Sequence, residues 1–179
     1  ATLALRDEIK QAASAVLVFL RSVEDVNKVA ERLRKETSQV RTLTGTLRGL
    51  ERDELATSDP VFARFLPKLE PNRERAPGAV YLICTSAGEV GVNISADHLV
   101  CDLTPFDSMA QRLGRVNRFG DGSALVDIVS TPTEEDPATE DAYQVACART
   151  RAILERLPTR EDGRYDASPA ALGAIPTDK

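Results

Sequence analysis

The sequence predicts an α/β fold: a parallel β-sheet with helices on both faces. Short apolar runs rich in β-branched residues recur along the chain, as in strands that are buried on both faces. Segments with apolar residues at helical spacing lie between these runs. The length of 179 residues suits one such domain with a modest extension. Because parallel strands need crossover connections, the alternation also predicts right-handed crossovers.

The first strand and helix are expected within residues 15–35. Residues 15–20 read AVLVFL, an uninterrupted apolar run. Ser22, with Asp25 three residues later, resembles a capping box in which Asp replaces the usual Glu. The apolar positions that follow recur at helical spacing up to about Lys35: Val26, Val29, Ala30 and Leu33.

The next segments are shorter and more polar. A second strand is expected at residues 40–44, a charged helix at 49–56 and a short helix at 60–69. Three prolines bound the polar segment 70–78, which is interpreted as an exposed loop insertion.

Three more strands are expected, at residues 79–84, 99–103 and 124–130. A helix at 107–118, with Asp107 as its N-cap, connects the last two. Beyond residue 131 the composition becomes acidic, and a helix is expected at 142–157. After Pro158 no period remains, so the tail is expected to be mobile or laid over a neighbour. The predicted parts are therefore a domain at 1–131 and a helical extension with a tail at 132–179.

Composition limits the function classes. The net charge is −5, so binding of nucleic acid must depend on local basic clusters. The absence of tryptophan disfavours a broad stacking platform for single strands. Three cysteines without a C-x-x-C pair disfavour a zinc site, and Cys84 and Cys101 are expected to be buried thiols. No apolar run is long enough to span a membrane, and no signal peptide is evident, so a cytoplasmic protein is expected. The first residue is Ala1 rather than Met, which favours a fragment.

Residues 111–120, QRLGRVNRFG, are the most informative segment. On a helix, Gln111, Arg115 and Arg118 would share one stripe. An opposite stripe toward the core would contain Met109, Leu113 and Val116. Two guanidiniums on one stripe suit phosphate oxygens. The alternatives are a solvated charged face, or salt bridges to Asp107 and Asp121.

Four segments in order resemble the motifs of superfamily 2 helicases. Residues 111–118 match Q-x-x-G-R-x-x-R of motif VI, and residues 84–94, CTSAGEVGVNI, resemble motif V. Residues 16–22 resemble motif IV, and Thr44-Gly45-Thr46 with Arg48 resembles motif IVa. More narrowly, residues 85–120 resemble the helicase–nuclease of type I CRISPR interference, particularly its I-G (formerly I-U) variant. This resemblance implies a second RecA-like motor domain, from a protein that unwinds and translocates on DNA to feed a nuclease.

The resemblance also implies roles for individual residues toward ATP. Arg118 would be the arginine finger, Arg115 a second γ-phosphate contact, and Gln111 a contact to the phosphate or the attacking water. Gly91 would let the backbone approach the nucleotide. Asn93 would bind the ribose hydroxyl, where many related helicases have Asp.

Nucleic-acid phosphates would be contacted by a separate set of residues, Ser22, Thr44, Arg48, Thr85 and Ser86. The remaining implied partners are single-stranded DNA, the CRISPR effector complex, and the first RecA-like domain and the HD nuclease domain of the same polypeptide. No membrane contact is expected.

What the 179 residues lack also bears on function. They contain no P-loop, and Asp53-Glu54-Leu55-Ala56 does not match the D-E-x-[DH] magnesium box. ATP with Mg²⁺ would therefore be held mainly by the first motor domain, and the chain alone is expected not to hydrolyse ATP. With His98 as its single histidine, the chain cannot contain an HD nuclease. His98 is expected to pack at a strand start, and a Ser86–His98–Asp102 triad lacks any nucleophile-elbow signature.

Two other functions stay open. The chain could belong to another superfamily 2 motor acting on RNA or in repair, although a DEAD-box helicase more usually has His where Gln111 stands. It could also be a non-enzymatic RecA-like module that binds nucleic acid. The intact Arg115 and Arg118 argue against a degenerate scaffold.

Overall fold

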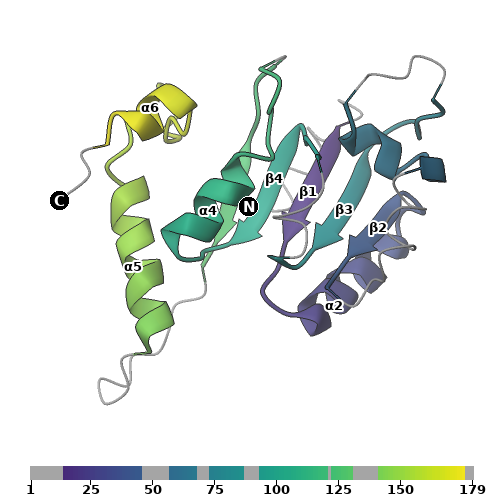
Figure 1. Ribbon diagram of the computed structural model, residues 1–179, viewed down its shortest axis with the longest axis horizontal. Helices are drawn as coiled ribbons and strands as arrows, with labels where there is room; N and C mark the ends of the chain where they lie inside the picture. The colour runs from purple at the N-terminus through teal and green to yellow at the C-terminus, as the bar shows by residue number, and fades with distance from the viewer. Residues whose placement is uncertain are drawn as a thin grey trace. The chain divides into compact units, whose positions relative to one another are not determined.

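The computed structural model describes residues 14–45, 57–67, 73–86, 93–120, 122–130 and 141–175. These residues contain five strands, all in one sheet of order β2-β3-β1-β4-β5 (Figure 1). The strands are β1 Ala15–Phe19, β2 Val40–Leu43, β3 Val80–Cys84, β4 His98–Asp102 and β5 Val126–Val129. Each neighbouring pair is parallel. The predicted parallel α/β fold is therefore confirmed.

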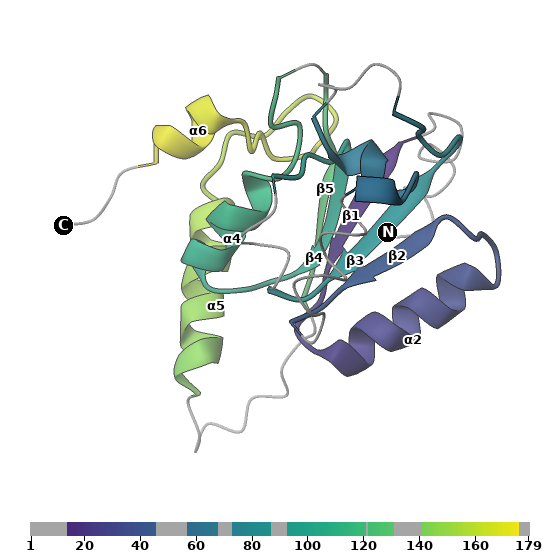
Figure 2. The ribbon, with the colours of Figure 1, turned by 45° about the vertical axis from the view of Figure 1, so that its right-hand side comes forward.

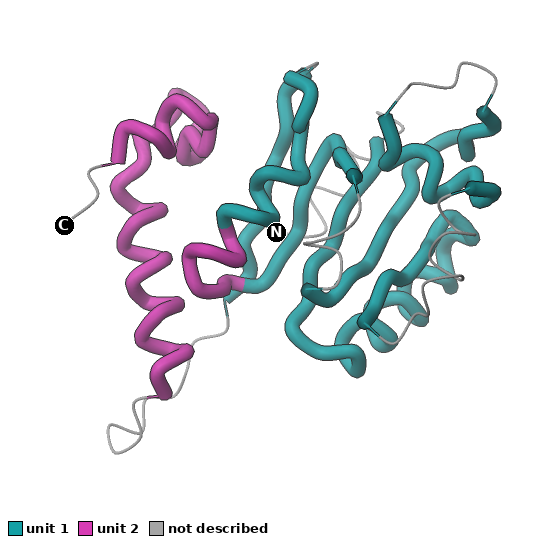
Figure 3. Tube along the Cα trace, in the orientation of Figure 1, with its two compact units in different colours: residues 1–102, 110–130 teal, residues 103–109, 131–179 magenta. Residues whose placement is uncertain are grey.

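The chain divides into two compact units (Figure 3). The first comprises Ala1–Asp102 and Ala110–Ser130 and contains the sheet. The second comprises Leu103–Met109 and Thr131–Lys179. Helix α4, Phe106–Leu113, is thus shared between the two units. The second unit thus includes residues 103–109 as well as the residues after 130. The sequence-based division into a domain at 1–131 and an extension at 132–179 stays a prediction.

The two central strands explain why the sequence shows continuous apolar runs. Every residue of β1 and β3 is buried. Burial on both faces removes the polar alternation of a half-exposed strand. In β4 only Leu99 and Cys101 are buried, and β5 at the sheet edge has no fully buried residue.

Helix α2, Val23–Arg34, covers one face of the sheet beside β2 and β3 (Figure 2). Ser22 caps it as predicted, because its Oγ accepts the Asp25 N–H at 3.0 Å. The Ser22 hydroxyl also donates to Asp25 Oδ2 at 2.6 Å. The helix buries Val26 and Ala30 in a cluster with residues from three strands: Val16, Val18, Val40, Tyr81 and Ile83. Fully burying a valine side chain contributes about 1.5–3 kcal/mol.

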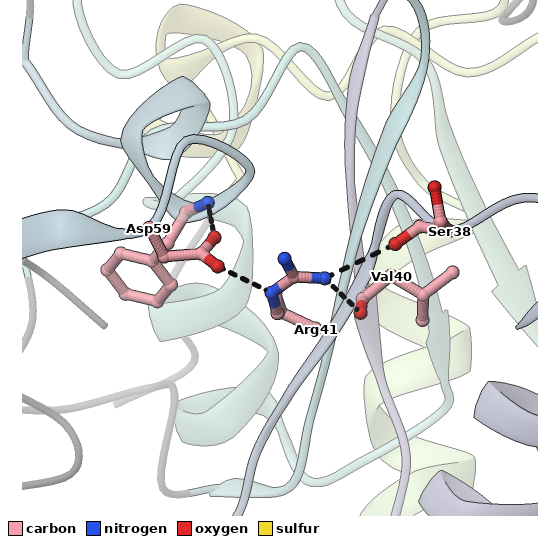
Figure 4. Close-up of polar contacts among 5 residues, drawn as sticks. Ser38, Val40, Arg41 and Asp59 are labelled. Atoms are coloured by element: carbon pink, nitrogen blue, oxygen red, sulfur yellow. Dashed lines mark hydrogen bonds and ion pairs between the residues drawn. The ribbon is translucent and has the colours of Figure 1, made fainter. Parts of the chain in front are cut away.

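A second segment, residues 57–67, is connected to the edge strand β2 by a partly buried ion pair. Arg41 Nε donates to Asp59 Oδ2 at 2.7 Å, and Asp59 Oδ1 accepts the Phe62 N–H at 2.7 Å. Figure 4 shows the Arg41 guanidinium between Asp59 and the carbonyls of Ser38 and Val40. The expected helix at 60–69 is only the 3₁₀ turn η1, Phe62–Phe65. Pro67 disfavours helical backbone at the residue before it, and that residue is extended.

The prediction of an exposed loop at 70–78 is partly right for residues 73–78, the part that the structure describes. These residues form no helix or strand, and Glu74, Pro77 and Gly78 are exposed, but the segment is not a free insertion. Ala76 is buried, and its N–H donates to the Pro60 carbonyl at 2.9 Å. Arg75 Nη1 donates to the Ala63 carbonyl at 2.6 Å, while Arg64 Nη1 donates to the Ala76 carbonyl at 2.9 Å. These hydrogen bonds run in both directions and hold residues 75–76 against η1. The expected helix at 49–56 lies outside the described residues.

The second unit contains helix α5, Ala142–Leu154, and the short helix α6, Pro169–Gly173. Asp141 caps α5 by accepting the Tyr143 N–H at 3.0 Å. The predicted helix end at 157 is three residues too late. The tail, in which the sequence shows no helical period, contains the short helix α6, capped by Ser168. That it is mobile or laid over a neighbour stays a prediction. Among the described residues no helix is long and apolar enough to cross a membrane.

Candidate functional site

Hydroxyl residues follow three neighbouring strands at one edge of the sheet. Thr44 follows β2, Thr85 and Ser86 follow β3, and Ser22 lies three residues after β1. Backbone bonds hold these strand ends level, since the Thr85 N–H donates to the Leu43 carbonyl at 3.2 Å. The structure therefore gathers four of the five residues predicted to contact nucleic-acid phosphates at the carboxyl edge. The fifth, Arg48, lies outside the described residues.

Two of these hydroxyl residues are less available than the sequence suggested. Thr85 is buried, and its N–H is occupied by the Leu43 carbonyl. The Ser22 hydroxyl is bonded to Asp25, whose carboxylate places negative charge beside it. Ser86 is exposed. A phosphate would therefore meet Ser86 more readily than Ser22.

The helix expected at 107–118 is wrong at both ends. Helix α4 begins at Phe106, so Asp107 lies in its first turn rather than at its N-cap. The helix stops at Leu113, so Arg115, Val116 and Arg118 are not on it. The proposed single stripe of Gln111, Arg115 and Arg118 is therefore wrong, and so is the opposite stripe.

Pairing with a distant segment replaces the last turn of the expected helix. Val116 forms a parallel bridge with Ala96. The Ala96 N–H donates to the Arg115 carbonyl at 2.8 Å, and the Asn117 N–H donates to the Ala96 carbonyl at 2.8 Å. The Arg118 N–H then donates to Ser95 Oγ at 3.1 Å. These bonds satisfy backbone groups that a longer helix would have paired internally.

The positive charge of Arg118 nevertheless acts on Arg115. The pKa of Arg115 lies below its ordinary value, first because the side chain is partly desolvated and second because of the positive charge of Arg118. Arg118 itself is exposed. Two neighbouring guanidiniums repel, and an anion bound between them would relieve that repulsion.

The other residues predicted to contact ATP lie near these arginines along the chain. Asn93 is exposed and precedes Ser95 by two residues, so it enters the segment that pairs with residues 115–118. Ala96, in that segment, lies two residues before β4, at the amino edge of the sheet. Gln111 is exposed on α4. Gly91 lies outside the described residues.

Arg112 is a buried arginine that the sequence did not single out. Only 3% of its side chain is exposed. Its Nη1 donates to Asp102 Oδ1 at 2.7 Å and to the Asp102 carbonyl at 3.1 Å. Its guanidinium also lies 5.0 Å from the centre of the Phe19 ring. Arg112 therefore joins the last turn of α4 to the ends of β4 and β1.

The remaining polar candidates have structural explanations. His98 Nδ1 accepts the Leu125 N–H at 3.1 Å at the start of β4, as its predicted packing role requires. Ser86 follows the carboxyl end of β3, whereas His98 starts β4, so the parallel pairing puts them at opposite edges and excludes a triad. Burial raises the pKa of the Cys84 thiol, an effect that the nearby charge of Arg112 partly offsets. The described residues contain no cluster of side chains able to hold a metal ion.

A family model described as the C-terminal part of the CRISPR-associated nuclease/helicase Cas3 matches residues 12–121. The chain belongs to this family. The match covers the whole sheet except β5, together with the arginine segment of this Cas3-type domain. A search of curated protein sequences gave no match.

Solved structures agree with this assignment at the level of the fold. Cas3 from T. fusca bound to AMPPNP matches 95% of the chain with a TM-score of 0.68 and 19% identity. A CRISPR RNA-guided surveillance complex, pre-nicking, matches 96% with a TM-score of 0.62 and 16% identity. The E. coli DEAD-box protein SrmB matches 72% of the chain and 69% of its own length, with a TM-score of 0.52 and 22% identity. The Cas3-like chain thus has the RecA-like fold, and it spans about a fifth of the T. fusca chain, 20%.

Proposed function

We propose that this chain is the second motor domain of an ATP-dependent superfamily 2 helicase, which translocates on and unwinds DNA to feed a nuclease in CRISPR interference. The observation that supports it most is the separation of two candidate faces on one RecA-like sheet. The backbone of Arg115 and Arg118 is bonded to the segment just before β4, and the charge of Arg118 acts on Arg115. The hydroxyl residues Thr44, Thr85 and Ser86 lie at the carboxyl ends of β2 and β3.

The arginine face would complete a nucleotide site whose other wall is the first motor domain. That domain would hold most of ATP and its Mg²⁺. Arg118 would reach the γ-phosphate as it is transferred, with Arg115 as a second contact and Gln111 near the attacking water. Fixed positive groups at this position stabilise the charge that develops in the transition state. Asn93 would accept a hydrogen bond from the ribose hydroxyl, and Gly91 would let the backbone come close to the nucleotide.

The carboxyl edge would hold the phosphates of single-stranded DNA. Thr44, Thr85 and Ser86 would donate hydroxyl hydrogen bonds, and Arg48 would add positive charge. Such contacts position a strand without reading its sequence. Ser22 would contribute through its place at the start of α2, with its hydroxyl already bonded to Asp25.

The whole protein would also contain an HD nuclease domain and would act with the CRISPR effector complex. The surveillance complex among the matched structures supports this association. Such a role would place the protein in the cytoplasm. That the protein is of the I-G (formerly I-U) variant stays a prediction.

The test is ATP turnover by the full-length protein with single-stranded DNA, single-stranded RNA or no nucleic acid. We expect DNA to stimulate turnover and RNA to have little effect. Stimulation by RNA alone would favour a different superfamily 2 motor. Absence of turnover with either would favour a non-enzymatic binding module.

A further inference from the structure

Asn117 has an unusual backbone conformation directly before Arg118. Its φ is 42°, and it is the one residue other than glycine with a positive φ among the residues that the structure describes. Left-handed backbone disfavours most side chains, although asparagine tolerates it better than others. Gly120, with φ of 73°, completes the turn, and its N–H donates to the Asn117 carbonyl at 3.0 Å. Arg118 and Phe119 therefore lie at the tip of a tight turn.

The side chain of Asn117 bonds to the backbone of Gly122, on the far side of the turn. Its Nδ2 donates to the Gly122 carbonyl, and its Oδ1 accepts the Gly122 N–H at 3.2 Å. Because a backbone N–H can only donate and a carbonyl can only accept, the orientation of the amide is determined by these two bonds. An aspartate could make only one of them, and an alanine neither.

Two further bonds hold the base of the turn to the neighbouring segment. The Asn117 N–H donates to the Ala96 carbonyl at 2.8 Å, and the Arg118 N–H donates to Ser95 Oγ at 3.1 Å. The backbone of Arg118 is thus held by Ser95 on one side and by the Asn117–Gly122 bonds on the other. The Arg118 side chain is exposed, so its backbone is the part that the fold can place in advance.

We propose that Asn117 is a positioning residue, whose amide bonds to Gly122 aim Arg118 at the γ-phosphate of ATP. This inference depends on the proposed function, because it needs Arg118 to act across the nucleotide. A catalytic group misplaced by about 1 Å can cost about 10²-fold in rate. A loop that is loosened at residue 117 would leave Arg118 present but misplaced.

The test compares Asn117→Gly and Asn117→Ala in the full-length protein, with DNA-stimulated ATP turnover as the readout. Glycine tolerates the positive φ but removes the amide bonds, whereas alanine removes the bonds and adds backbone strain. We expect Asn117→Gly to lower kcat by about tenfold or more with KM changed by less than about twofold, and Asn117→Ala to lower kcat further. A purely structural role would instead lower the melting temperature without this split. Asn27→Gly, on the exposed side of α2, is the matched control and should keep wild-type kcat.

Arg118→Ala measured in parallel separates the two ideas. If Arg118→Ala is inactive while Asn117→Gly keeps a kcat within about twofold of wild type, the positioning role is wrong and the proposed function stands. If Arg118→Ala keeps wild-type turnover, the proposed function fails, and the positioning role fails with it.

Discussion

Replacing Arg112 by alanine tests the structural role of the buried arginine that joins α4 to β4 and β1. The substitution removes a guanidinium that is 3% exposed, that bonds Asp102 twice and that lies over Phe19. Losing one member of a buried ion pair costs about 3–5 kcal/mol. The side chain of Asp102 is 28% exposed, so water can partly replace the lost partner, which places the expected loss near the lower limit. We expect the free energy of unfolding to fall by about 3 kcal/mol.

The assay is urea denaturation of the chain, followed by circular dichroism, with Arg32→Ala as the control. Arg32 is exposed on α2, and its removal should change stability by less than about 0.5 kcal/mol. Asp102→Asn keeps an oxygen acceptor but leaves the buried Arg112 charge without its countercharge, so it should cost about 1.5–3 kcal/mol. If Arg112→Ala were as stable as Arg32→Ala, the buried role of Arg112 would be refuted.

Three further outcomes are expected. The isolated chain folds but releases no phosphate from ATP, with or without DNA, and turnover near that of a working helicase would contradict the need for a first motor domain. Full-length Ser86→Ala, which removes the exposed hydroxyl after β3, needs about two- to tenfold more DNA for half-maximal ATPase stimulation, as loss of one hydrogen bond predicts, while Thr42→Val within β2 does not. The pKa of the buried Cys84 thiol is raised, so less thiolate forms at any given pH. We expect Cys84 to stay unreactive toward a thiol reagent even at about pH 9 until urea unfolds the chain. Rapid labelling of Cys84 in the native state would contradict this.

The strands could be predicted from sequence because their positions follow from local composition. Residues buried on both faces must be apolar without interruption, and β1 and β3 show this in full. The cap of α2 was also predictable, because Ser22 and Asp25 are only three residues apart. Such short-range patterns need no knowledge of the tertiary structure.

The segment from 114 to 118 could not be predicted in the same way. The helical spacing of Gln111, Arg115 and Arg118 favoured a longer helix, yet the chain pairs with Ala96 instead. That competition is between segments about twenty residues apart, and sequence periodicity does not register it. The charge of Arg118 still acts on Arg115, although the two residues do not share a helix.

Arg112 and Arg41 show a second limit. Arginines are usually exposed, so the sequence alone assigns neither of these residues a structural role. Their partners, Asp102 and Asp59, are 10 and 18 residues away in sequence. Only the fold brings these pairs together. The tail shows a smaller omission, since the Ser168-Pro169 start of α6 is a local capping signal that was present in the sequence.

The most direct test of the central claim is the turnover number of full-length Arg118→Ala with saturating single-stranded DNA, measured beside ATP affinity. Arg149→Ala, an exposed arginine on α5, is the control. We predict that Arg118→Ala lowers kcat by about 10³-fold or more while ATP affinity changes by less than about fivefold, because the contact forms chiefly in the transition state. Wild-type kcat in Arg118→Ala would contradict the assignment of this chain as the second wall of an ATPase site.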